Sequence, residues 1–191
     1  DESSGETILM PVDVDPDIDW CLPYYRDVGV VLAWGFRPLD IFLGVFSRES
    51  DVTSGGRQMP NHWSHPGLRI FSQGSVIATQ FPQAAGIAYE LSRTGRPGIV
   101  LATGGEGSTS EGDFHEGLNF ASVWQAPAVL ICANNQWAIS TPRSKQTHAK
   151  SLAQKAIAYD LTARIHGTDE AERQVVVASA AFATDRLCRF R

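Results

Sequence analysis

An acidic residue inside a glycine-rich loop is the feature of this sequence that points most directly to chemistry. Glu106 lies between Gly105 and Gly107 in the stretch TGGEGSTSEGD, residues 103–113. Loops of this kind usually bind phosphate through backbone N–H groups, and a carboxylate would repel a bound phosphate. A divalent cation between the two groups removes that repulsion. The loop therefore predicts a site for a phosphate compound together with a cation.

Two asparagines supply a second candidate ligand. Asn134 and Asn135 end the apolar run PAVLICANN, and Asn135 follows Glu106 by 29 positions. If the strands before Glu106 and Asn135 are neighbours in a parallel sheet, both residues lie at its carboxyl edge, where such sheets bind ligands. One carboxylate, one amide oxygen, phosphate oxygens and water form a shell that suits Mg²⁺. We expect Asn134 to cap the strand end instead.

Two common phosphate-binding motifs fit this loop poorly. A Walker loop requires Lys followed by Ser or Thr after its glycines, and the sequence has neither here. The dinucleotide fingerprint is nearly met at Gly105, Gly107 and Ser110, but Ser110 replaces its third glycine. The acid expected about 20 residues later is also missing. Both interpretations are therefore weak.

The segments around the loop predict a parallel βαβ unit. The apolar run 98–104 predicts a buried strand, 110–126 an amphipathic helix, and 127–135 a second buried strand with Cys132 in the core. Ser110 is the expected helix cap. The expected core-facing residues of the helix are Phe114, Leu118 and Ala121. The fold class is α/β, a parallel sheet flanked by helices.

Other segments read as helices and loops around this unit. Helices are expected over 38–48, 145–160 and a stretch that has Pro82 in its first turn and ends at Gly95. The turn-rich run 49–67 predicts a long loop, and loops of that length are often functional. Residues 1–23 are acidic and rich in proline, and we expect a mostly irregular lead-in.

Composition excludes several functional classes. The chain has 191 residues, 43% of them apolar, which suits one globular domain. A net charge of −5 argues against broad nucleic-acid binding. No apolar run reaches the roughly 18 residues of a membrane span, and the acidic N-terminus lacks the features of a secretory signal. Three dispersed cysteines without a CxxC pair indicate a reducing, cytosolic setting.

The stretch 105–141, GEGSTSEGDFHEGLNFASVWQAPAVLICANNQWAIST, resembles the thiamine-diphosphate motif of GDG or GEG followed by paired asparagines. It is similar to the alpha subunit of the decarboxylating component of 2-oxo acid dehydrogenase complexes. The similarity extends over residues 24–159 and includes GGRQMPNH and ATQFPQAAGIAYE. Glu in the loop and the GRQMP stretch favour the branched-chain 2-oxo acid enzymes. The stretch QTHAKSLAQKAIAY also resembles pyruvate-type subunits, and acetoin is a further candidate substrate.

The resemblance implies a thiamine-diphosphate-binding fold and a set of site residues. The magnesium ligands are Glu106, Asn135 and the backbone carbonyl of Trp137. The cofactor-binding residues are Tyr25, Arg26, Ser75, Ile77, Gly105, Gly107, Ser108 and Asn135. Thr79 and Gln80 match a potassium loop, but Gly74 and Val76 replace its Ser and Pro, which argues against that site.

The resemblance also implies a reaction and partners. A 2-oxo acid substrate loses carbon dioxide, and its acyl group passes to a lipoyl arm of the acyltransferase component. A beta subunit supplies the glutamate that activates the cofactor, in a heterotetramer. The setting would be the cytoplasm, or the mitochondrial matrix in a eukaryote.

The ends of the chain depart from the family pattern. The family has a longer N-terminal helical segment and a C-terminal half that carries its active-site histidine. The flanks of His166 do not match that loop, so no catalytic residue is assigned. The family often has a histidine at the position of His62, which makes His62 a candidate site residue. We expect three parts: a lead-in over 1–23, a thiamine-diphosphate-binding domain over 24–165, and a divergent tail over 166–191. A domain incomplete at both ends predicts low activity, and an inactive remnant that keeps cofactor or partner binding is the alternative.

Some side chains have a plain structural interpretation beside a functional one. Arg57 and Gln58 shape a loop near the site or only pack it. His65 is expected at the surface, and His115 in an ordinary helix pair with Glu111. Trp124, like Trp137, is expected in the core or in an interface.

Overall fold

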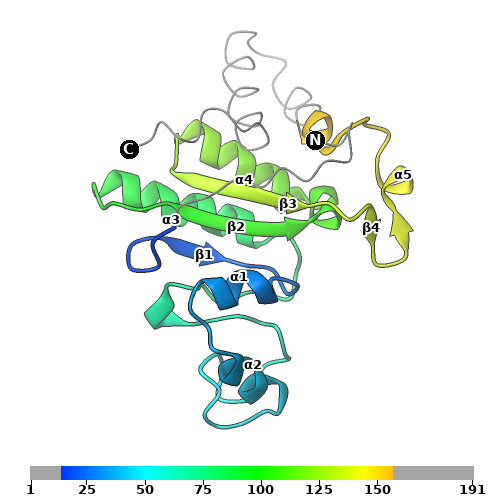
Figure 1. Ribbon diagram of the computed structural model, residues 1–191. Coiled ribbons are helices and arrows are strands. Elements are labelled where there is room, and N and C mark those ends of the chain that lie inside the picture. The colour runs from blue at the N-terminus through cyan, green and yellow to red at the C-terminus, as the bar shows by residue number, and fades with distance from the viewer. Residues whose placement is uncertain (1–13, 157–191) are drawn as a thin grey trace.

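A computed structural model describes residues 14–156 of the chain (Figure 1). His166, Cys188, the tail over 166–191 and the end of the helix expected over 145–160 lie outside the described residues. No helix in the described range is long and apolar enough to cross a membrane.

The described part of the chain is built on a three-stranded parallel sheet in the order β1-β2-β3 (Figure 1). The strands are β1 (Trp20–Leu22), β2 (Val100–Gly105) and β3 (Ala128–Ala133). Helix α4 (Gly112–Val123) connects β2 to β3, which pair with Gly105 opposite Ala133. The predicted parallel βαβ unit is confirmed, and both strand ends meet at one edge.

Strand β1 was not predicted, because it lies inside the segment expected to be an irregular lead-in. Its three residues pair with β2, so that Trp20 lies opposite Val100. Just before β1, the buried carboxylate of Asp19 accepts a hydrogen bond from the backbone N–H of Ile99 at 2.7 Å. A strand this short has no periodicity of its own. It exists because two distant segments supply its hydrogen bonds: β2, some 80 residues later, and the segment around Ile70, where Cys21 N donates to the Arg69 carbonyl oxygen at 3.0 Å.

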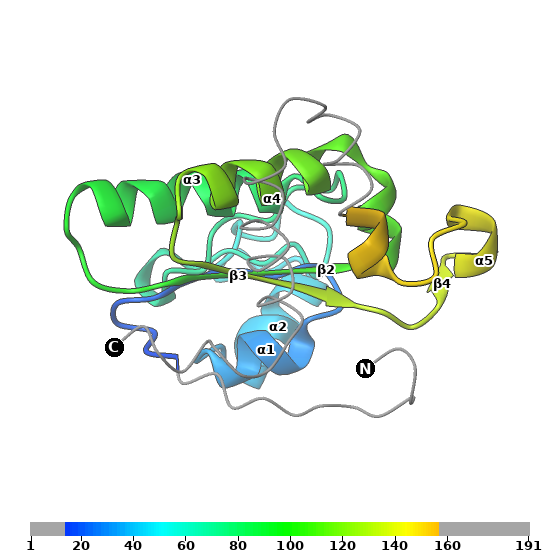
Figure 2. The same ribbon diagram turned by 90° about the horizontal axis from the view of Figure 1, so that it is seen from above.

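Alternate residues of the sheet pack into two separate cores. On one face, Val100, Ala102 and Leu130 pack against α4 and α3 (Gln80–Arg93). On the other face, Leu101 packs in a cluster with Trp34 of the segment after α1 (Val28–Ala33). Figure 2 shows α3 and α4 on one side of the sheet and α1 and α2 on the other. Burial of both faces is typical of a parallel sheet.

Strand β3 is less buried than the sequence predicts. Leu130 is its only fully buried residue, Ile131 is 37% exposed, and Cys132 is half-buried rather than a core residue. Among residues 14–156, β3 has one neighbouring strand, and no described strand pairs with its outer edge. An apolar run alone does not distinguish such an edge strand from a central one.

Small residues let α3 and α4 pack closely. Phe114 is buried against Phe81 in an edge-to-face contact, and Ala121 is buried with it, as the helix periodicity predicts. Leu118 is partly buried against the same cluster. A Cβ atom on Gly117 would lie 2.6 Å from the backbone carbonyl carbon of Phe81. The close approach of the two helices therefore requires glycine at position 117.

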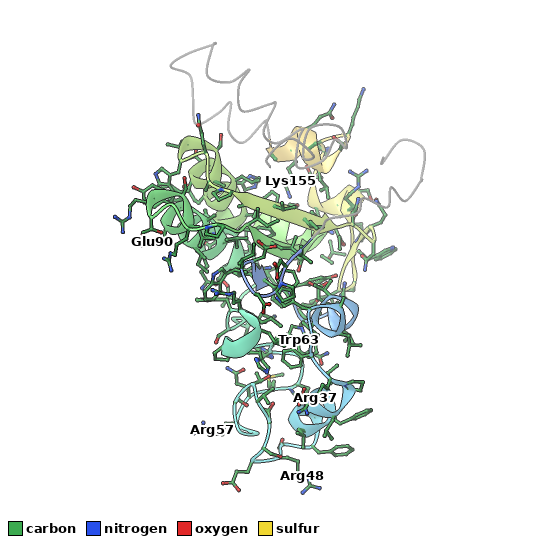
Figure 3. All side chains as sticks on the ribbon, turned by 60° about the vertical axis from the view of Figure 1, so that its left-hand side comes forward. Arg37, Arg48, Arg57, Trp63, Glu90 and Lys155 are labelled. Atoms are coloured by element: carbon green, nitrogen blue, oxygen red, sulfur yellow. The ribbon has the colours of Figure 1, made fainter. Side chains whose placement is uncertain are left out.

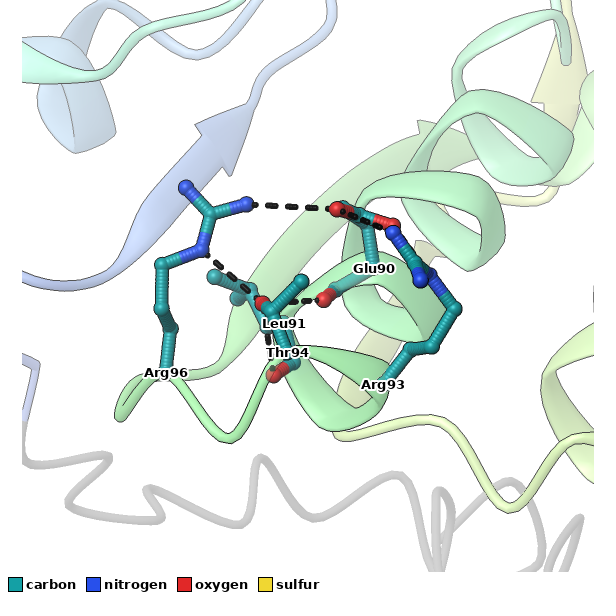
Figure 4. A network of polar contacts seen from close by, with 5 residues as sticks. All are labelled: Glu90, Leu91, Arg93, Thr94 and Arg96. Carbon is teal, nitrogen blue, oxygen red and sulfur yellow. Dashed lines mark hydrogen bonds and ion pairs between the residues drawn. The ribbon is translucent and has the colours of Figure 1, made fainter.

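Helix α3 ends as the sequence predicts. Gly95 has a φ of +65° just past the last turn. Figure 4 shows that the Glu90 carboxylate accepts a hydrogen bond from Arg93 Nε at 2.8 Å and pairs with Arg96 at 3.7 Å. The Thr94 hydroxyl donates to the Glu90 carbonyl oxygen at 2.6 Å. The terminal carbonyls are paired by the backbone, since Gly95 N donates to the Ser92 carbonyl oxygen at 3.1 Å and Arg96 N to that of Leu91 at 3.0 Å.

Below the sheet lies a smaller lobe built from α2 (Pro38–Val45) and the long loop after it (Figure 3). Asp40 is buried and forms a 2.6 Å ion pair with Arg37, whose hydrogen bond holds the pKa of this carboxyl below its ordinary value. His65 is not the plain surface residue that the sequence suggested. Its Nδ1 accepts from Leu68 N at 3.2 Å and caps the short 3-10 helix η1 (Pro66–Leu68).

The segment after β3 differs from the predicted single helix over 145–160. It forms a hairpin of β4 (Trp137–Ala138) and β5 (Thr141–Pro142), followed by the one-turn helix α5 (Arg143–Gln146). Thr147 is extended, with φ −156° and ψ 146°, and interrupts the helix. Helix resumes at residues 152–156.

Candidate functional site

The glycine-rich loop is a single 3-10 turn, η2 (Glu106–Ser110), at the carboxyl end of β2. The Glu106 side chain is 1% exposed, and its Oε1 has no hydrogen-bond partner among the described residues. A buried polar atom without a partner is costly, and a carboxylate more so, unless a cation compensates it. This unsatisfied oxygen fits a metal ligand. No cluster of three His, Cys, Asp or Glu lies in residues 14–156, so amide, carbonyl or ligand oxygens would complete the shell.

The asparagines lie at the same edge of the sheet. Asn134 Oδ1 accepts from Gln136 N at 3.0 Å, and Asn135 Oδ1 accepts from Trp137 N at 2.9 Å. These turns direct the chain into the β4–β5 hairpin. The hairpin meets the loop, because a Cβ atom on Gly107 would lie 2.9 Å from Ala138 Cβ. The structure thus brings η2 and the segment after Asn135 together, although Trp137 is 51% exposed and is not a core residue.

Ser110 does not cap α4 as predicted. The capping position belongs to Glu111, which makes no side-chain cap bond, and Asp113 is the acid in the first turn. The Ser110 hydroxyl instead accepts from Lys155 Nζ at 2.9 Å. The 3-10 turn includes Ser110, so the helix begins later than the serine suggests.

His115 is buried and contacts the turn. Its Nε2 lies 3.0 Å from the carbonyl oxygen of Thr109, in the turn itself. Burial lowers the pKa of His115 below its ordinary value. A neutral imidazole that donates from Nε2 is consistent with this contact, and it fixes the end of η2 against α4.

The Tyr25–Arg26 pair is held beside the loop by a network that the sequence did not reveal. Tyr24 N donates to Thr103 Oγ1 and to Asp27 Oδ2, both at 3.1 Å, and Thr103 Oγ1 donates to Asp27 Oδ2. Burial raises the pKa of Asp27. Both Tyr25 and Arg26 are exposed, with the Arg26 guanidinium over the Tyr25 ring at 5.2 Å. One signal for the network was available: Thr103 is a hydroxyl residue in an otherwise apolar strand.

Two predicted site loops meet at a hydrogen bond. His62 Nε2 lies 2.6 Å from Ser75 Oγ, and Ser75 and Ile77 are exposed. The segment after Ser75 leads into α3, where the buried Gln80 donates to the Thr103 carbonyl oxygen at 2.7 Å. The loop is thereby tied to the carboxyl end of β2.

Other candidate residues form hydrogen bonds within their own loops. The hydroxyl of Thr79 donates to the Val76 carbonyl oxygen at 3.0 Å. Arg57 Nε donates to the Ser54 carbonyl oxygen at 2.8 Å, and Gln58 N to the Ser54 hydroxyl, which supports loop packing for both residues. Trp124 is 38% exposed and stacks on Phe120, so it is not a core residue.

Comparison with known sequences gives one family and several relatives. The family model described as dehydrogenase E1 component matches residues 4–189. The 2-oxoisovalerate dehydrogenase subunit alpha of Bacillus subtilis (strain 168) is 41% identical over 160 residues, which cover 83% of this chain and 48% of that protein. The mitochondrial 2-oxoisovalerate dehydrogenase subunit alpha 1 of Arabidopsis thaliana is 44% identical over 157 residues, 82% of this chain and 33% of that protein.

A pyruvate-type relative matches at a similar level. The pyruvate dehydrogenase E1 component subunit alpha of Staphylococcus aureus (strain Mu50) is 44% identical over 140 residues, which cover 73% of this chain and 35% of that protein. The chain therefore spans about half or less of the length of these curated relatives.

Proposed function

Because this chain belongs to the dehydrogenase E1 component family, we propose that it is the alpha-type chain of a 2-oxo acid dehydrogenase that binds thiamine diphosphate with Mg²⁺. The observation that carries the proposal is the buried Oε1 of Glu106, in a glycine-rich turn, which has no hydrogen-bond partner within residues 14–156. A bound cation satisfies this oxygen and at the same time allows a diphosphate to lie beside it. Without a cation, the Glu106 carboxylate and the diphosphate would repel each other.

Different residues at the sheet edge would bind the metal and the diphosphate. Glu106, Asn135 and the carbonyl of Trp137 would hold the metal, and Gly105, Gly107 and Ser108 the diphosphate. The N-terminus of the twelve-residue helix α4 adds attraction for an anion.

Residues outside the turn would bind the rest of the cofactor. Arg26 is exposed and offers fixed donors to phosphate oxygens, with Tyr25 stacked beneath it. Ser75 and Ile77 would lie beside the ring system, with Ser75 oriented by His62. The cofactor supplies the nucleophilic and electron-accepting chemistry for removal of carbon dioxide. The chain binds and orients it, with no catalytic residue assigned beyond the candidate His62.

For the substrate we propose a branched-chain 2-oxo acid of the 3-methyl-2-oxobutanoate type, with acyl transfer to a lipoyl group. Glu106 and the stretch 55–62 favour this choice, and two of the relatives are named 2-oxoisovalerate dehydrogenase subunits. Pyruvate is the second candidate, because a pyruvate dehydrogenase relative matches at the same identity. The proposed partners are a beta subunit and the lipoyl acyltransferase component.

Reconstitution tests this proposal. The full chain is combined with a beta subunit, thiamine diphosphate and Mg²⁺, and carbon dioxide release is measured from 3-methyl-2-oxobutanoate and from pyruvate. We expect faster turnover of the branched substrate. Equal or faster turnover of pyruvate would overturn the substrate assignment. Cofactor binding without any turnover would favour the alternative of an inactive remnant.

A further inference from the structure

A lysine from the segment after the hairpin reaches the cofactor turn. Lys155 lies in the helical residues 152–156, and its Nζ donates to Thr109 Oγ1 at 3.1 Å and to Ser110 Oγ at 2.9 Å. Figure 3 labels Lys155 on the upper part of the molecule, far from the lobe that carries Arg48 and Arg57. Two of its three ammonium donors are therefore used on two consecutive hydroxyls of η2.

Hydrogen bonds link Lys155 through Thr109 to Glu106, the predicted metal ligand. The hydroxyl of Thr109 donates its single hydrogen to the carbonyl oxygen of Glu106 at 2.7 Å, and Thr109 is 1% exposed. A hydroxyl has one donor and two acceptor sites, so Lys155 can occupy only an acceptor site. The ammonium thereby orients the hydroxyl toward Glu106. Bonds in such a chain polarise and strengthen one another.

The last two residues of the turn are thus held by two side chains from different elements. His115 Nε2 contacts the Thr109 carbonyl oxygen at 3.0 Å, while Lys155 holds the Thr109 and Ser110 side chains. On this basis we propose that Lys155 is a positioning residue that fixes the backbone of Glu106, and hence its carboxylate, for the metal and diphosphate. The inference rests on the proposed function and deepens it. The ammonium also adds a positive charge next to the part of the loop that would face an anion.

The test compares the full chain with three variants. Lys155→Met keeps most of the unbranched side chain and removes the charge and the donors, and Lys155→Arg restores both. Lys150→Met removes an exposed lysine from the same segment and is the matched control. The apparent Mg²⁺ affinity is measured by calorimetry at saturating thiamine diphosphate. Hydrogen exchange of the backbone amides over 106–111 is measured in the cofactor-free chain.

We expect Lys155→Met to weaken Mg²⁺ binding by about 10- to 100-fold, the usual effect of losing a partner that orients a metal ligand. Amide exchange in the turn should accelerate in the same variant. Lys155→Arg should recover affinity to within a few-fold, and Lys150→Met should match the wild type. Wild-type affinity in Lys155→Met, or equal losses in both methionine variants, would overturn the inference.

Two further outcomes are decisive. If Lys155→Met does not fold, Thr109→Val tests the same chain of bonds, because valine keeps the shape and removes the hydroxyl. An unchanged Mg²⁺ affinity in Thr109→Val would then overturn the inference. If the wild type binds no Mg²⁺ and thiamine diphosphate, the proposed function fails. Amide exchange in the cofactor-free variants still decides whether Lys155 holds the turn.

Discussion

The packing of α3 against α4 predicts opposite effects on stability for the same substitution, glycine to alanine, at two positions. Gly86 lies inside α3, and a Cβ atom at this position would have no atom within 4 Å apart from its neighbours in the same helix. A Cβ atom on Gly117 of α4 would lie 2.6 Å from the Phe81 backbone. Replacing glycine by alanine inside a helix raises the free energy of unfolding by about 1 kcal/mol. Overpacking costs about 1–3 kcal/mol, and a backbone neighbour cannot rotate away, so the upper end applies to Gly117.

We therefore expect Gly86→Ala to raise the free energy of unfolding by about 1 kcal/mol and Gly117→Ala to lower it by about 2 kcal/mol. In a chain of this size the loss corresponds to a melting temperature about 4–8 °C lower. Thermal unfolding followed by circular dichroism measures both variants against the wild type. If Gly117→Ala is as stable as Gly86→Ala, the described approach of the two helices is wrong.

Two further substitutions test the polar contacts that Gln80 and Asp27 make with Thr103 of β2. Gln80→Leu removes the buried hydrogen bond to the Thr103 carbonyl oxygen and should lower the urea-unfolding free energy by about 1–3 kcal/mol. The exposed neighbour Gln83→Leu should stay within about 0.5 kcal/mol, and equal effects would contradict this account. Burial raises the folded-state pKa of Asp27, so its ionisation costs stability as pH rises from about 3.8 through that raised pKa. The unfolding free energy of the wild type minus that of Asp27→Asn should fall across this window, and a flat or rising difference would refute the sign.

The sequence predicted local elements well and long-range contacts poorly. Strand β2 and helix α4 begin and end within three residues of their expected bounds, because apolar runs and helix periodicity are local signals. Strand β1 was not predicted, because Trp20–Leu22 is stabilised by β2 and by the segment around Ile70, both of which lie far away in the sequence. The exposure of β3 was not predicted either, since the exposure of a strand depends on how many strands flank that strand.

The candidate site shows the same division. Glu106 and the asparagines could be placed at one sheet edge, because the ends of neighbouring parallel strands must meet. Ser110 was assigned to the helix cap because it is a good capping residue next to a helix. A lysine 45 residues later takes its hydroxyl instead, and no local pattern predicts that contact.

The central claim is that Glu106 holds a cation which in turn holds a diphosphate. Calorimetric titration of thiamine diphosphate into the full chain, with and without Mg²⁺, tests it most directly. We predict binding only when Mg²⁺ is present, at least tenfold weaker binding in Glu106→Gln, and wild-type binding in the control Glu111→Gln, whose side chain is exposed. Equal binding without Mg²⁺, or wild-type affinity in Glu106→Gln, would contradict the claim.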